Sequence, residues 1–110
     1  MASGHLKDPN QVAFGLLLVP SSGSETGYKI VVLARSGSAY SLQILDQAEG
    51  QPGSASGLVI AKVAPGKYPG FDEPQAISLK LDGLEAQWIE KASVLYFWQD
   101  GKFQTLQTSD

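Results

Sequence analysis

Val94-Leu95-Tyr96-Phe97-Trp98 is the most strand-like stretch of the chain, because Val94 is β-branched and three aromatic residues follow. It runs into Gln99-Asp100-Gly101-Lys102, where the glycine supplies the positive φ of a tight turn, and Phe103–Gln107 returns as a second strand. Successive side chains point to opposite faces of a strand, so Tyr96 and Trp98 share one face. We expect one set of aromatic rings to fill the core of a β domain and the other to pack across strands.

Period-two alternation of apolar residues marks further strands upstream of this hairpin. They are expected at Gln11–Val19, Tyr28–Arg35, Ala39–Asp46, Leu58–Val63, Gln75–Leu81 and Leu84–Glu90. Gln11–Val19 is apolar on both faces, which is typical of a central strand covered on both sides. Gly37 lies at the bend of one predicted hairpin, and Asp82-Gly83 is a strong dipeptide for another.

These segments predict an all-β fold with about eight antiparallel strands in a sandwich or partly closed barrel. One short helical turn near Glu85–Ser93 stays open, because that segment contains good helix formers, and a distorted α+β arrangement is the alternative fold. The 110 residues suit one domain. We predict a flexible leader or tail at residues 1–10 and a single β domain at residues 11–110.

Charge and composition exclude several classes of function. The net charge is -3, and the eight lysines and arginines are scattered, so neither nucleic-acid binding nor a polybasic membrane anchor is expected. The absence of cysteine excludes disulfides, thiolate metal sites and cysteine nucleophiles. No stretch approaches the ~18 apolar residues of a membrane span, so no membrane insertion is expected, and Met1–Lys7 lacks the apolar region of a signal peptide.

Motifs for catalysis and metal binding are missing as well. His5 is the only histidine and falls in the predicted leader, so we expect no catalytic role for it and no zinc site. The segment nearest to a nucleophile elbow has Ala55 where a serine is required. No calcium loop or phosphate-binding loop occurs. We therefore predict no catalytic residue, metal or cofactor, and a non-enzymatic protein is favoured over an enzyme.

The loop Ala64–Pro74 is the candidate contact surface, because it is longer than a plain turn and its prolines stiffen it. A stiff loop that presents aromatic side chains loses little entropy on binding. Its candidate partner-binding residues are Lys67, Tyr68, Phe71, Asp72 and Glu73. The alternative is that Tyr68 and Phe71 cap one end of the core.

Two stretches together resemble a group of known sequences: Pro65-Gly66-Lys67-Tyr68, and the region Leu79–Asp110 with Leu81-Asp82-Gly83-Leu84, Glu90–Trp98 and Asp100-Gly101-Lys102-Phe103. The chain resembles small exported bacterial proteins of uncharacterised function, whose C-terminal halves contain P-G-x-Y, D-G-I and E-x-x-S-x-x-Y-Y-W-x-x-x-x-F and end in S-D. The resemblance implies export to the periplasm or cell surface and no activity. Members often have cysteines after P-G-x-Y, where this chain has Gly70 and Phe71.

These observations lead to three hypotheses about function. The first is a non-enzymatic binding module, exported in bacteria, that recognises a protein or an envelope component such as a glycan; an inhibitor or immunity protein is one form of it. The second is a carboxylate-dependent glycan hydrolase that uses two of Asp72, Glu73, Glu85 and Glu90. The third is a structural protein that dimerises through an exposed strand edge. The sequence leaves the oligomeric state open.

Overall fold

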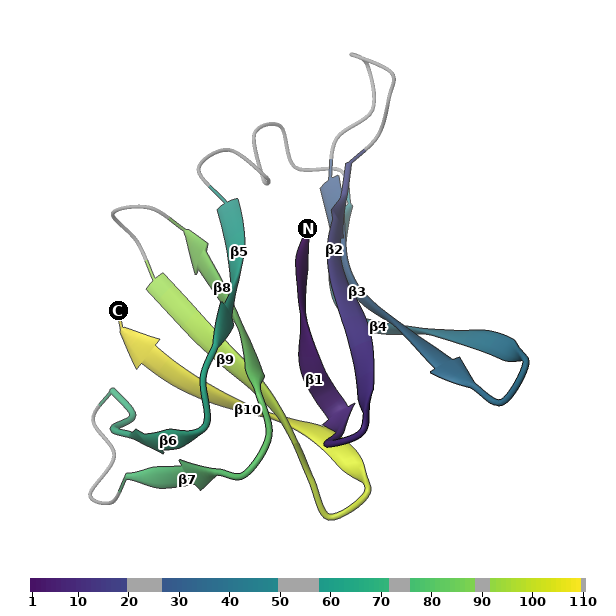
Figure 1. Ribbon diagram of the computed structural model, residues 1–110. Helices are drawn as coiled ribbons and strands as arrows, with labels where there is room; N and C mark the ends of the chain where they lie inside the picture. Colours follow the sequence, from purple (N-terminus) through teal and green to yellow (C-terminus); the bar gives the residue numbers. More distant parts are fainter. Residues whose placement is uncertain (20–26, 50–57, 72–75, 89–91, 110) are drawn as a thin grey trace.

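The computed structural model describes residues 1–19, 27–49, 58–71, 76–88 and 92–109. Within these ranges the chain forms ten strands and no helix (Figure 1). The strands are β1 (Ala2–Asp8), β2 (Gln11–Leu18), β3 (Gly27–Ser36), β4 (Ala39–Glu49), β5 (Leu58–Val63), β6 (Gly66–Tyr68), β7 (Ile77–Leu79), β8 (Gly83–Trp88), β9 (Ala92–Gln99) and β10 (Lys102–Ser109). None of the described segments is a helix that would cross a membrane.

The strands build two four-stranded antiparallel sheets and one short third sheet. The first sheet has the order β1-β2-β3-β4, the second has the order β10-β9-β8-β5, and β6 pairs with β7 (Figure 1). The prediction of an all-β fold is confirmed, and the sheets stay open, as in a sandwich, instead of closing into a barrel. The helical turn expected near Glu85–Ser93 is wrong for the described residues, because Gly83–Trp88 and Ala92–Gln99 are strands.

The main core lies between the two large sheets. Ile30 and Val32 of β3 contribute to it from the first sheet, and Leu84 of β8 and Tyr96 of β9 contribute from the second. Gly15 of β2 allows the layers to approach closely, since a Cβ atom at this position would lie 2.7 Å from Leu84 Cδ1. A larger residue at position 15 would therefore push the sheets apart.

A second core lies on the opposite face of the second sheet. Leu95 and Phe97 of β9 and Leu106 of β10 pack there against Leu79 of β7. The small β6–β7 sheet covers this cluster, and Tyr68 of β6 packs at its edge. The second sheet is thus covered on both faces. Tyr96 and Phe97 point to opposite faces of this sheet, and each is buried in a different core.

The N-terminal residues differ from the prediction of a flexible leader. Ala2–Asp8 forms β1, which pairs with β2, and the Leu6 side chain is only 1% exposed in the main core. Ala2 and Gly4 lie on the inward face with Leu6, but their small size hides the apolar alternation in the sequence. The edge strand β1 therefore has too weak an apolar pattern to be predicted from the sequence.

The dipeptide Asp82-Gly83 does not close a hairpin, which corrects a second expectation. The β7 strand pairs with β6 instead of β8, and the chain passes from this small sheet into the second sheet between Leu79 and Gly83. The Asp82 Oδ2 atom accepts a hydrogen bond from the His5 backbone N at 2.7 Å, and the Asp82 N donates to His5 O at 3.0 Å. Asp82 therefore links the edge strand β1 to the second sheet.

The two other predicted turns are confirmed. The β9–β10 hairpin closes through Asp100, with a φ of 55°, and Gly101, with a φ of 78°. Gly37, with a φ of 64°, lies at the bend between β3 and β4. Glycine takes these left-handed conformations without the steric conflict that a Cβ atom creates.

Candidate functional site

The loop predicted to contact a partner is only partly available for contact. Tyr68 is half-buried against the second core, and its hydroxyl donates to Ala64 O at 2.5 Å. This arrangement is the one expected if Tyr68 caps the core. Lys67 is exposed on β6, opposite Ser78 of β7.

Phe71 is the exposed aromatic residue of this loop. Its side chain is 48% exposed, while its backbone N donates to Gln107 O at 2.7 Å and holds the segment against β10. Asp72 and Glu73, the acidic residues of the predicted contact set, lie outside the described residues. The structure therefore separates the two predicted anchors: Tyr68 packs on the core and Phe71 faces solvent.

Of the four carboxylates named for a glycan hydrolase, Glu85 is the one that lies within the described residues. Its Oε1 atom accepts from Gln87 Nε2 at 2.8 Å, and its Oε2 atom accepts from Thr108 Oγ1 at 3.2 Å. Asp72, Glu73 and Glu90 lie outside the described residues. Within the described part of the chain, no three histidine or acidic side chains gather to hold a metal ion.

The aromatic residues of the C-terminal hairpin mainly build the two cores. Tyr96 and Phe97 are buried, and Trp98 packs edge-on against Phe103 with a centroid distance of 5.0 Å. The Lys7 Nζ atom lies 4.6 Å from the centre of the Trp98 ring, a cation–π contact between β1 and β9. The expectation that one set of rings fills the core is confirmed.

A depression of about 540 Å³ lies beside this hairpin, and its lining includes Leu79, Lys80, Phe97, Trp98 and Asp100. Leu79 and Phe97 belong to the second core, so the floor of the depression is core packing. Its polar lining residues, Ser78, Lys80, Gln99 and Asp100, are exposed on the surface. The arrangement suits structural packing more directly than the binding of a specific ligand.

Two tyrosines and one carboxylate meet between the sheets. The Tyr28 hydroxyl donates to Asp46 Oδ2 at 2.9 Å, and the Tyr28 ring packs edge-on against Trp88. Burial, followed by the hydrogen bond and the charge of Asp46, raises the pKa of Tyr28 to about 12. Burial also raises the pKa of Tyr96, with a smaller contribution from the Asp46 charge. Both phenols therefore stay neutral at physiological pH and act as structural groups.

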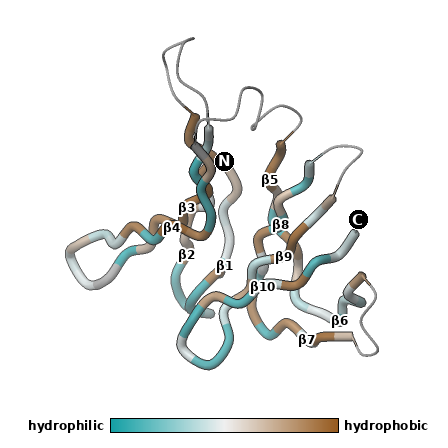
Figure 2. Tube along the Cα trace, turned by 180° about the vertical axis from the view of Figure 1, so that it is seen from behind, coloured by the Kyte–Doolittle hydropathy of each residue, from teal (hydrophilic) through white to brown (hydrophobic). Residues whose placement is uncertain are grey.

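The outer apolar face is the most distinctive surface of the molecule. We use this name for the side of the first sheet that is turned away from the second sheet, and its members are Val12, Phe14, Leu16, Leu18, Leu33, Tyr40, Leu42 and Ile44. Its orientation follows from alternation, because Ala13, Ile30 and Val32 point into the main core. Hydrophobic segments run along β3 and β4 in Figure 2.

The ladder of the first sheet brings these side chains into continuous rows. Phe14 of β2 pairs with Leu33 of β3, and Leu33 pairs with Leu42 of β4. Val31, in the adjacent row, is 0% exposed although it belongs to neither core cluster. Its ladder partners in that row are Leu16 of β2 and Ile44 of β4.

Five members of this face remain open to solvent. Val12, Leu18, Tyr40, Leu42 and Ile44 are between 44% and 63% exposed. Period-two alternation in the predicted strand Ala39–Asp46 places Tyr40, Leu42 and Ile44 on one face, but it does not tell which face is covered. The signal that was available is the double-sided apolar pattern of Gln11–Val19.

The tip of the β3–β4 hairpin forms a projecting arm. The β2–β3 ladder ends at Phe14 and Leu33, and beyond it residues 34–41 pair within the hairpin. Figure 1 shows this tip extending away from the rest of the fold. The arm carries Tyr40, the most exposed member of the outer apolar face, and Leu42 lies at its base, paired with Leu33.

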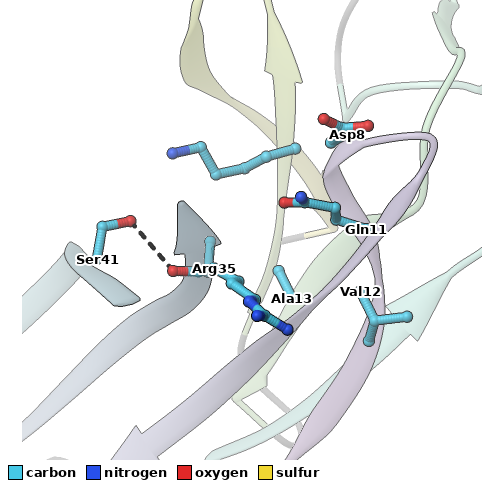
Figure 3. Close-up of a pocket in the computed structure, with 8 residues that line it drawn as sticks. Asp8, Gln11, Val12, Ala13, Arg35 and Ser41 are labelled. Carbon is cyan, nitrogen blue, oxygen red and sulfur yellow. Dashed lines mark hydrogen bonds between the residues drawn. The ribbon is translucent and has the colours of Figure 1, made fainter. Parts of the chain in front are cut away.

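Depressions lie on both sides of the gap between β2 and the arm. One, of about 240 Å³, includes Ala13 and Ser41 in its lining, and the Ser41 hydroxyl donates to Ala34 O at 3.4 Å (Figure 3). The other, of about 490 Å³, includes Val12, Phe14 and Tyr40. The second depression opens on the outer apolar face and gives it a concave region beside the arm.

Comparisons with known proteins found no match, so the function is argued from the geometry described above. The chain matches no family model, and no curated protein or solved structure matches it.

Proposed function

We propose that this chain is a non-enzymatic module that binds another protein chain through the outer apolar face. The single observation that carries the proposal is the exposure of five large apolar side chains on β2 and β4, the two strands that flank β3: Val12, Leu18, Tyr40, Leu42 and Ile44. Scattered exposed apolar residues are ordinary, but a contiguous patch of this kind marks an interaction site.

The chemistry of the face favours a protein over other partners. Its centre is apolar and aromatic, as in the cores of protein interfaces, and the arm presents Tyr40 with few torsion angles to immobilise. The cations beside it are Arg35 and Lys29, which are too few for the phosphates of a nucleic acid. The adjoining depressions are open, whereas small-molecule sites enclose most of their ligand.

The proposed contact surface differs from the one that the sequence predicted. The hypothesis of a non-enzymatic binding module is retained, while the contact moves from the loop Ala64–Pro74 to the first sheet. Phe71 remains the exposed aromatic residue of that loop, because Tyr68 packs on the second core. Export remains a prediction from the resemblance.

Photocrosslinking tests the proposal. Tyr40 is replaced by a photoreactive phenylalanine derivative in the full chain, and the protein is irradiated in the cells that produce it. We expect a discrete crosslinked product. The matched control places the same residue at Val59, which is 45% exposed on β5 of the other sheet and should give no product. Crosslinking at Tyr40 no stronger than at Val59 would contradict the proposal.

A further inference from the structure

We propose that the partner is a second copy of this chain, with the outer apolar faces of two copies packed against each other about a two-fold axis. The inference rests on the proposed function and adds the identity of the partner. Sheets pack face to face through apolar side chains at a separation of ~10 Å, and an identical sheet supplies the same chemistry on both sides. The contact is isologous, which means that both copies use the same surface. Each residue of the outer apolar face therefore contacts the outer apolar face of the partner.

The composition of β2 is the first argument. Ala13 and Leu17 pack toward the second sheet, and the residues between them, Phe14 and Leu16, point to the other side. A strand that is apolar on both faces belongs in a sheet covered on both faces. The second sheet has such a cover in β6–β7, whereas the first sheet, in the part of the chain that the structure describes, is covered on one face.

The uncovered area is the second argument. Full burial of a valine, leucine or isoleucine side chain removes about 60–120 Å² of apolar surface from water. Five side chains that are close to half exposed therefore leave about 200–400 Å² uncovered. Two such faces provide about half of the ~1,200 Å² that a specific interface needs. The partly exposed Phe14, Leu16 and Leu33 add to this area.

Charge is the third argument. Ala39–Leu45 of β4 contains no charged residue, so this stretch brings no charge into the contact. The cations of the face lie at opposite ends of β3: Arg35 pairs with Tyr40, and Lys29 pairs with Leu18. The Arg35 Nε atom donates to Gly37 O at 2.9 Å at the tip of the arm. When two copies pack together, the centres of their outer apolar faces therefore come into contact without burying charges of the same sign.

Shape is the fourth argument. The same face carries the projecting arm and, beside it, the depression of about 490 Å³ lined in part by Val12 and Phe14. A two-fold axis brings a projection and a hollow of each copy to the same contact, with the exposed Arg35 of each copy at its periphery. A surface with a projection and a matching hollow is self-complementary.

Sedimentation equilibrium of the full chain over about 1–500 µM tests the proposal, because association depends on concentration. We expect a dimer in the wild type. Leu42→Lys should raise the dissociation constant at least about tenfold, because it places a charge at the centre of the face. Val59→Lys is the matched control, since Val59 has similar exposure on the other sheet, and it should leave the dissociation constant unchanged.

Val12→Lys distinguishes face packing from edge pairing. Val12 lies on β2, away from the free edge of β4, so packing of the faces predicts weaker association and pairing through the β4 edge predicts no change. Circular dichroism and thermal unfolding check that each variant folds. If Leu42→Lys fails to fold, Tyr40→Glu on the arm replaces it, because Tyr40 is the most exposed of the five side chains.

Several outcomes would overturn the proposal. They are a monomeric wild type at the highest concentration, a dimer that Leu42→Lys leaves intact, a dimer that Val12→Lys leaves intact, and a monomer that binds vesicles of anionic phospholipid through this face. Failure of this inference remains distinguishable from failure of the proposed function. A Tyr40 crosslink to a chain of a different mass retains the binding function and rejects the second copy, whereas a missing crosslink rejects both.

Discussion

Truncation of Leu6 tests whether the N-terminal strand is part of the folded core. Leu6 is 1% exposed and packs in the main core with Leu84 and Tyr96. Leu6→Ala removes three carbon atoms, which costs about 2.4 kcal/mol in transfer free energy. The cavity left behind raises the loss to about 3–4 kcal/mol, because the surrounding side chains relax only in part.

Urea unfolding followed by the fluorescence of Trp88 and Trp98 measures this loss. We expect the urea midpoint to fall by about 1–3 M with an unchanged slope, and the melting temperature to fall by more than about 10 °C. The substitution is made in the Leu42→Lys background, so that association does not contribute to the apparent stability.

Ser3→Ala is the control for this experiment, because Ser3 is exposed on the same strand. It should change the free energy of unfolding by less than about 0.5 kcal/mol. A Leu6→Ala loss of that same small size would refute the reasoning, since it would show that β1 contributes nothing to the core.

Three further predictions follow from other contacts. Gly15→Val should lower the free energy of unfolding by about 1–3 kcal/mol, measured by urea unfolding, because the new side chain meets Leu84; an unchanged midpoint would show that the sheets are not in close contact. Asp82→Ala should destabilise the fold by about 1 kcal/mol, while Asp82→Asn, which retains an acceptor for the His5 N, should cost less; equal losses would argue against that hydrogen bond. The pKa of Tyr28 is about 12 in the folded chain and 10 in the unfolded chain, so the unfolded chain loses the phenol proton at lower pH. Stability is therefore fully present below pH 10 and declines as the pH rises toward 12. Thermal melts across this range should show a smaller decline for Tyr28→Phe, and an identical decline would rule Tyr28 out as the source.

The alternation of apolar residues predicted most of the strands, because the pattern depends on local geometry alone. Val94–Trp98 and Phe103–Gln107 form the expected hairpin, and Gly101 takes the expected positive φ. The β1 strand escaped prediction because its inward residues include Ala2 and Gly4, whose small side chains carry little hydrophobic signal. Asp82-Gly83 was assigned to a turn from its local preference, but contacts with His5, 77 residues away, determine its structure.

The candidate site was harder to predict than the strands. The sequence shows that Tyr40, Leu42 and Ile44 share a face, but whether a second layer covers that face depends on how the sheets stack. The same limit applies to Tyr68, whose aromatic ring suited both a binding surface and a core cap until its contact with the second core was known.

The β9 strand and the arm should differ strongly in the rate at which their backbone amides exchange hydrogen with solvent. The amides of β9 lie in the middle of a sheet that is packed on both faces, so their exchange requires unfolding of the whole domain. The arm at residues 34–41 is a two-stranded ribbon without a neighbouring strand, and it opens locally at much lower cost. A surface carried on such a ribbon adjusts to its partner while the other sheet preserves the fold.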